Sequence, residues 1–136
     1  MVSKRSEGDL QRRRALADAA AGVVQRFRCV IYLCAAPNTN IAVPREECTE
    51  YAQAFGWEIT EVIEERAGLL PPRGRAGLER ALGYVSSGEA GAVLTAWRSM
   101  ISSLPQEYDE VAREIEKSGG FLHVKHSART EQRAPL

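Results

Sequence analysis

The chain has 136 residues, of which 44% are hydrophobic and 26% are charged, a composition typical of one globular domain and unlike that of disordered, collagenous or coiled-coil chains. Its 18 basic and 18 acidic residues give a formal net charge of zero, which argues against a surface built as a whole to bind nucleic acid. Three cysteines without a C-x-x-C pair exclude a disulfide framework and predict no metal site. No apolar run is long enough to span a bilayer and residues 1–8 lack the core of a signal peptide, so we expect a cytoplasmic protein without a cofactor or a membrane partner.

Residues 1–27 are predicted to form a basic segment that contains a helix. Residues 1–26 hold six Lys or Arg and three Asp or Glu, a net charge of +3, so the remainder carries −3. Apolar residues at helical spacing predict a helix that Asp9 caps and that ends near Arg26: these are Leu16, Ala20, Val23, Val24 and Phe27. Within it, Arg12, Arg13 and Arg14 have two possible roles, a solvated helix end or a contact to phosphates.

From residue 28 onward, short β-rich runs alternate with one-faced helices. The first run, Cys29–Cys34, has no polar alternation, as expected of a strand that is covered on both faces. The other predicted strands are Trp57–Ile63, Ala92–Ala96 and Phe121–Val124. This spacing of strands predicts parallel pairing with helical crossovers.

Apolar residues at i, i+3, i+4 and i+7 predict a helix after each of the first three strands. The first residues of this apolar spacing are Cys48, Leu78 and Tyr108. Gly56 is expected to end the first of these helices, and an S-x-x-Q capping box over Ser103–Gln106 is expected to open the third. Between the second strand and its helix, the glycines and prolines of residues 64–74 predict a long loop.

These elements predict a doubly wound α/β domain over residues 28–126, with about four parallel core strands and helices on both faces. The polar residues 127–136 are expected to form a flexible tail. In such sheets, ligands bind outside the carboxyl ends of the strands. Functional residues are therefore expected at those ends.

The strand ends carry few groups with obvious chemistry. Neither G-x-G-x-x-G nor a P-loop follows a strand, so nucleotide binding by those motifs is not expected. Cys34 fits a buried structural cysteine better than a nucleophile, because no histidine adjoins it. His123 is expected to be a core or edge residue and His126 part of an exposed tail. Trp97 has two equal interpretations, a partner-facing anchor or a cover for the sheet edge.

The order of elements and several local motifs resemble the catalytic domain of the serine recombinases, the resolvase/invertase family. In that family, a Y-x-R-x-S strand leads to the nucleophilic serine, and G-W-E, R-x-G-L and D-R-L-x-R motifs follow. This chain has Tyr32–Ala36, Gly56–Glu58, Arg75–Leu78 and Arg98–Ser102 at the corresponding places. The resemblance covers about residues 28–125 and implies a resolvase-like fold.

The same resemblance implies a degenerate active site. The family's serine attacks the scissile phosphate, and arginines around it neutralise the charge. Here Ala36 stands at the serine position and Cys34 at that of the first arginine. Ser99 and Ser102 replace the arginines of the D-R-x-x-R turn, in which Arg98 would compensate only with a shifted register. Arg75 is the active-site arginine that is retained. The resemblance therefore implies a catalytically inactive domain that acts as an interaction or regulatory module, with a second copy, an active recombinase or another DNA-transaction protein as its partner.

Two alternatives come from other functional classes. One is a nucleic-acid module that binds phosphates weakly through the Arg12–Arg14 run together with Arg75 and Arg98. The other is a repurposed enzyme that uses Cys34 or Thr39 as its nucleophile.

Overall fold

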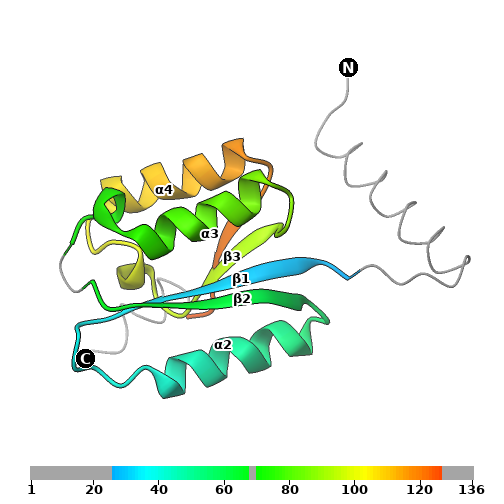
Figure 1. Ribbon diagram of the computed structural model, residues 1–136, viewed down its shortest axis with the longest axis horizontal. Coiled ribbons are helices and arrows are strands. Elements are labelled where there is room, and N and C mark those ends of the chain that lie inside the picture. Colours follow the sequence, from blue (N-terminus) through cyan, green and yellow to red (C-terminus); the bar gives the residue numbers. More distant parts are fainter. Residues whose placement is uncertain (1–25, 68–69, 127–136) are drawn as a thin grey trace, which may run out of the picture.

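The computed structural model describes residues 26–67 and 70–126, which form one parallel sheet with helices on both faces (Figure 1). The strands, with their bounds, are β1 (Arg28–Cys34), β2 (Glu58–Glu65), β3 (Ala92–Thr95) and β4 (Phe121–Val124). The helices are α2 (Ala42–Ala54), α3 (Ala76–Ser86) and α4 (Pro105–Lys117), with 3₁₀ turns η1 (Pro72–Gly74) and η2 (Arg98–Met100). The helix predicted before residue 26 and the tail predicted for residues 127–136 lie outside the described residues.

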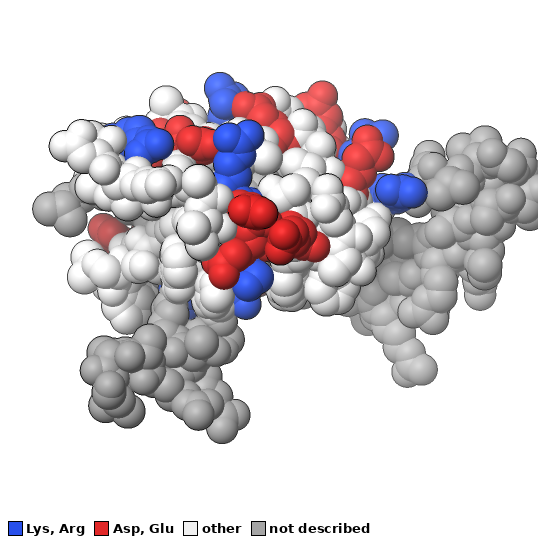
Figure 2. Space-filling model, turned by 90° about the horizontal axis from the view of Figure 1, so that it is seen from below, with Lys and Arg blue, Asp and Glu red and all other residues white. Residues whose placement is uncertain are grey.

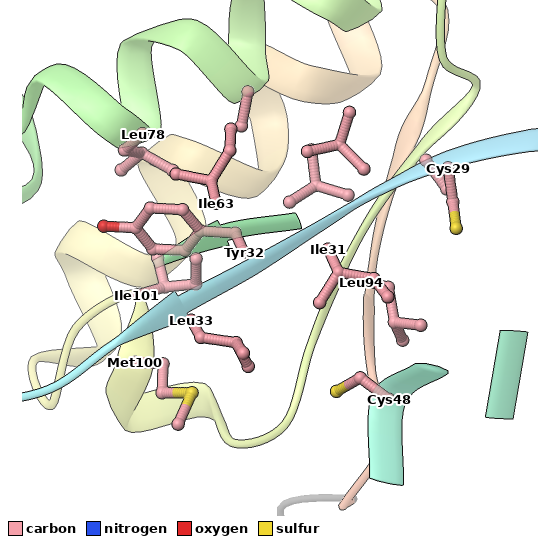
Figure 3. Close-up of a cluster of buried hydrophobic side chains, with 14 of the residues drawn as sticks. Cys29, Ile31, Tyr32, Leu33, Cys48, Ile63, Leu78, Leu94, Met100 and Ile101 are labelled. Atoms are coloured by element: carbon pink, nitrogen blue, oxygen red, sulfur yellow. The ribbon is translucent and has the colours of Figure 1, made fainter. Parts of the chain in front are cut away.

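The sheet has the strand order β2-β1-β3-β4, and every pair is parallel. The central strand β1 is buried from Cys29 to Cys34, as expected of an apolar run between two layers. Figure 3 shows Tyr32 directed toward Leu78 of α3, whereas Cys29 and Leu33 point to the opposite face. The doubly wound α/β fold predicted from the sequence is thus confirmed.

The two faces of the sheet are covered unequally. Helix α3 packs on β1, β2 and β3, and α4 packs on β4, so one face carries two helices. On the other face α2 packs mainly on β1 and β2. Figure 1 shows the same arrangement, with α3 and α4 together on one side of the sheet and α2 on the other. None of the described helices is both long enough and apolar enough to cross a bilayer.

Several predicted boundaries differ from those observed. Strand β2 runs to Glu65 instead of Ile63, because it pairs with β1 as far as Cys34. The capping box predicted over Ser103–Gln106 is wrong: Pro105 is the first helical residue of α4, which makes Leu104 the cap and leaves Ser103 exposed. The glycine predicted to end α2 is confirmed, since Gly56 has a φ of 72° just beyond the helix.

Candidate functional site

The carboxyl ends of β1, β2 and β3 lie along one edge of the sheet, where a doubly wound fold places its ligands. Cys34 ends β1 with only 8% of its surface exposed, and Ala36 and Thr39 follow in an exposed loop. The Thr39 N–H donates to the Ala36 carbonyl at 3.0 Å, which closes this loop as a turn. The position of Ala36 therefore presents a methyl group to solvent, and Cys34 presents almost nothing.

Glu65, the last residue of β2, caps the amino end of α3. Its Oε2 accepts the Gly77 N–H at 2.7 Å, and its Oε1 accepts the Leu78 N–H at 3.1 Å. A carboxylate at this place satisfies two of the N–H groups that a helix leaves without partners, and it complements the helix dipole. The amino end of α3 is thus occupied by a side chain of the protein itself.

Gly77 makes this cap possible. A Cβ at position 77 would lie 2.9 Å from the Glu65 Cδ and 3.0 Å from each carboxylate oxygen, closer than side chains tolerate. The glycine of the Arg75–Leu78 motif therefore has a structural purpose, which is to let a carboxylate approach the helix end.

Tyr32 completes the network from the centre of the sheet. Its hydroxyl donates to the Glu65 Oε1 at 2.5 Å, and its side chain is fully buried. Burial, followed by the hydrogen bond to Glu65, raises the pKa of the Tyr32 phenol, while Arg75 nearby lowers it by a smaller amount. The phenol therefore stays protonated as a hydrogen-bond donor and is not a base or a nucleophile at neutral pH.

Arg75, the arginine that the resemblance retains, points into the protein. Only 5% of its surface is exposed. Its Nε donates to the Leu70 carbonyl at 2.9 Å, and its Nη1 donates to the Met100 carbonyl at 2.8 Å. These bonds connect the loop before α3 with the turn after β3, so the guanidinium fixes two loops to each other.

The segment that corresponds to the arginine turn also makes internal contacts. The guanidinium of Arg98 lies 4.3 Å from the centre of the Tyr108 ring, a cation–π contact to α4. The Ser102 hydroxyl donates to the Glu107 Oε1 at 2.7 Å and accepts the Leu104 N–H at 3.0 Å. Ser99 is exposed. Ser102 thus holds the start of α4, a role that the predicted capping box assigned to Ser103.

The rim of this edge is charged but internally paired. Arg45 donates to Glu64 at 2.7 Å, and Arg66 lies 3.8 Å from the same carboxylate. Arg66 also donates to the carbonyls of Pro37 and Thr39. Arg45, Glu64 and Arg66 border an open groove of about 610 Å³ along α2. Figure 2, which views the molecule from the side of α2, shows basic and acidic side chains interspersed rather than a continuous basic patch.

His126 is not part of an exposed tail, and this prediction is wrong. Its ring stacks on Trp97 with 5.0 Å between the centroids and 10° between the planes. Its Nε2 lies 3.3 Å from Glu47 Oε1 on α2, and its backbone N–H donates to the Ala96 carbonyl, which extends the pairing of β4 with β3. Trp97 consequently covers the sheet edge, in agreement with one of its two interpretations.

The arrangement offers structural hydrogen bonding rather than an activated nucleophile. Cys34 is buried, the Tyr32 hydroxyl is already engaged, and Arg75 donates to carbonyls. Across residues 26–67 and 70–126, no three His, Cys, Asp or Glu side chains converge as metal ligands. Sequence reasoning missed Glu65 as the centre of this network. The available signal was an acidic residue at the end of β2 followed by the glycine of the Arg75–Leu78 motif.

Comparison with known proteins shows a likeness in structure alone. No family model and no curated protein matches the chain. The C-terminal catalytic domain of ISC1926 TnpA, an IS607-like serine recombinase, is 22% identical with a TM-score of 0.61, over 81% of this chain and 78% of that one. The N-terminal catalytic domain of TP901-1 integrase is 17% identical with a TM-score of 0.64, over 77% of this chain and 86% of that one.

A third similar crystal structure, the first open reading frame of transposon ISC1904 from Sulfolobus solfataricus P2, is 16% identical with a TM-score of 0.52, over 76% of this chain and 74% of that one. At these identities the comparison establishes the fold. The resemblance to the resolvase-like fold that the sequence motifs predicted is therefore confirmed.

Proposed function

We propose, from the premise that this chain has the fold of serine recombinase catalytic domains, that it acts as an interaction or regulatory module in DNA recombination or a related DNA transaction. In this role it forms no covalent bond to DNA. Its partner is a second copy of the chain or an active recombinase.

The observation that carries the proposal is the chemistry at the carboxyl ends of the strands. Where the resemblance places the nucleophile, Ala36 has only a methyl group. Arg75 is buried and donates to the Leu70 and Met100 carbonyls, so its guanidinium is already engaged within the protein. Loss of a nucleophile alone typically lowers the rate by several orders of magnitude, and the loss of its charged partners removes the remaining stabilisation.

The retained scaffold supports a role for its surfaces. Tyr32, Glu65 and Gly77 form a hydrogen-bond network that stabilises the fold. A domain that keeps such a scaffold without the nucleophile can still bind a second copy or an active recombinase.

Covalent capture on DNA tests the absence of chemistry. The full chain is incubated at low salt with nicked and supercoiled duplexes, beside an active serine recombinase on its own sites as the positive control. We expect no covalent protein–DNA adduct, and an adduct at any serine would overturn the proposal.

Light scattering coupled to gel filtration tests the interaction, for the chain alone and mixed with an active serine recombinase. A dimer, or a complex with the recombinase, is expected. A monomer that forms no complex with either would remove the support for an interaction module.

The nucleic-acid alternative loses two of its arginines. Arg75 is buried, and Arg98 stacks on Tyr108, so phosphate binding would depend on Arg12–Arg14. Triple substitution of that run by Gln tests it: if this alternative holds, the salt-dependent shift of labelled DNA disappears in the variant, because phosphate contacts supply nearly all non-specific affinity.

A further inference from the structure

A cluster of aromatic side chains lies at the amino ends of the strands, opposite the site described above. Phe27 precedes β1, Trp57 precedes β2 and Phe121 begins β4. The ring centroids of Phe27 and Trp57 are 5.2 Å apart and those of Phe27 and Phe121 are 5.7 Å apart. Tyr51 and Phe55 at the end of α2 extend the cluster, with 4.9 Å between their centroids.

This aromatic cluster remains open to solvent in the described part of the chain. Phe27, Phe55 and Phe121 expose 40%, 60% and 38% of their surface. Single exposed apolar residues are common, but contiguous aromatic groups on a soluble domain mark a surface that something covers.

The cluster lies on the sheet face that has only one helix. Phe121 pairs in register with Ala92, and His123 with Leu94, so these side chains project from β3 and β4 on one face. His123 also contacts α2, since its Nε2 lies 2.7 Å from the Tyr51 hydroxyl. Because α2 packs mainly on β1 and β2, the aromatic side chains form much of the cover of β3 and β4 on this face. The opposite face has α3 and α4 in the equivalent layer.

Residues 1–25 join the described chain beside this cluster. Only Arg26 separates them from Phe27. The apolar stripe predicted for this segment (Leu16, Ala20, Val23 and Val24) continues at helical spacing to Phe27 itself. The opposite side of the same helix would hold Gln11, Arg14, Asp18 and Gln25, which are all polar. The segment is therefore amphipathic, and Phe27, which lies outside any helix just after it, is already a member of the cluster.

We propose that residues 9–25 form a helix that packs its apolar stripe on the aromatic cluster and covers β3 and β4 next to α2. A helix of this length extends about 25 Å at about 1.5 Å per residue. Entering β1 through a tight turn, it would run antiparallel to that strand, as helices do in this class of fold. Arg12, Arg13 and Arg14 would then lie toward the carboxyl ends of the strands.

The chain's own segment is favoured over a second copy for two reasons. It is joined to the cluster by a single residue, so docking is intramolecular and has a high effective concentration. Residues 1–25 carry a net charge of +2, which complements the −2 on residues 26–136, including Glu58, which is exposed next to Trp57.

Paired aspartate substitutions in the full chain test this docking. The variant Leu16→Asp/Val23→Asp places two charges on the stripe, and the control Gln11→Asp/Gln25→Asp places the same charges on the polar side. Both variants and the parent with which they are compared carry Trp97→Phe, which leaves Trp57 as the only tryptophan. Acrylamide quenching then reports how accessible Trp57 is, and circular dichroism confirms that each variant is folded.

Quenching of Trp57 is expected to rise severalfold in the stripe variant and to stay at the parent level in the control, with the same measured mass in all three proteins. Equal quenching in all three proteins would overturn the proposal. Protection of Trp57 that appears only as the protein concentration and the measured mass rise would also overturn it, in favour of a second copy.

Hydrogen exchange provides a second measurement, which needs only a single substitution in the stripe. In the parent chain, the backbone amides of residues 14–24 should exchange severalfold more slowly than in the milder variant Ala20→Asp. Fast exchange of these amides in both proteins would contradict a docked helix.

Discussion

The two ends of this parallel sheet differ in what they leave for other molecules. At the carboxyl ends, where folds of this class place their chemistry, Tyr32 donates to Glu65, and Glu65 and Arg75 are hydrogen-bonded to the backbone. At the amino ends, the rings of Phe27 and Phe121 stack on each other and are exposed to solvent. The end that is expected to be reactive is closed, and the end that is expected to be structural is exposed.

This contrast separates positions that affect stability from positions that affect contacts with other surfaces. Polar groups satisfied within the fold contribute to stability, because an unpaired buried donor or acceptor costs about 1–3 kcal/mol. Exposed aromatic rings contribute little to the isolated domain and become valuable when another apolar surface covers them. The comparison therefore predicts that changes at the carboxyl ends affect stability, and that changes at the amino ends affect what the protein contacts.

The largest expected effect is on the rate of thiol alkylation, which would be slow if the carboxyl end is closed and fast if it is open. Cys34 is 8% exposed, and burial raises the pKa of Cys29 to about 11 and that of Cys48 to about 12. We expect iodoacetamide at neutral pH to modify all three in the native chain at least about 100-fold more slowly than free cysteine, because the buried thiols react only when the fold opens. Mass spectrometry over time measures this, with the urea-unfolded chain as the control. Native labelling of Cys34 as fast as free cysteine would restore the hypothesis that it is a nucleophile.

Replacing Glu65 by Ala should produce the largest loss of stability. It leaves the Gly77 and Leu78 N–H groups and the buried Tyr32 hydroxyl without their acceptor. We expect the free energy of unfolding to fall by about 2–4 kcal/mol in a urea titration.

The neighbouring Glu64 is a matched control for that variant. It is more exposed and pairs with Arg45 and Arg66 at the surface, so Glu64→Ala should cost less than about 1 kcal/mol. Equal losses in the two variants would mean that the Glu65 network adds nothing beyond surface charge.

Gly77→Ala tests the same network through its geometry. The added Cβ would lie 2.9 Å from the Glu65 Cδ, so the carboxylate must move away from the helix end, at a cost of about 1–3 kcal/mol. Gly83→Ala in the same helix meets nothing within 4 Å and should stabilise the protein by about 0.5–1 kcal/mol. Thermal unfolding of both variants decides the matter: two shifts of the same sign would contradict a specific requirement for glycine at position 77.

How much of the molecule the sequence could predict depends on the range of the interaction. Short-range patterns were sufficient for the strands and helices: Phe121–Val124 matches β4 residue for residue, and the glycine at the end of α2 was placed correctly. The predicted cap of α4 was wrong because two signals competed there, the S-x-x-Q capping box and a proline. Pro105 takes the first helical position, which excludes Ser103 as the cap.

Long-range contacts were the part that the sequence did not reveal. Glu65 meets Tyr32 across 33 positions of the chain, and Arg75 reaches Met100 across 25. His126 looked like part of a polar tail, yet its position is determined by Trp97 and by Glu47, which is 79 positions away. Such partners are brought together by the sheet, so local periodicity does not predict them.

The smallest predicted effect comes from His123 at the exposed aromatic end. Burial lowers its pKa, so the folded protein favours the neutral ring more than the unfolded chain does. The sign follows from linkage: as the pH falls below about 6.5, the unfolded chain takes up the proton first, and stability decreases until the pH passes the lower folded pKa. Above about pH 6.5, His123 has no effect on the pH dependence. Urea titrations between pH 5 and 7 should show this decrease, and it should be weaker in His123→Gln, in which the amide can still bond to Tyr51. An unchanged slope in that variant would mean that the aromatic end leaves His123 as well solvated as the unfolded chain does.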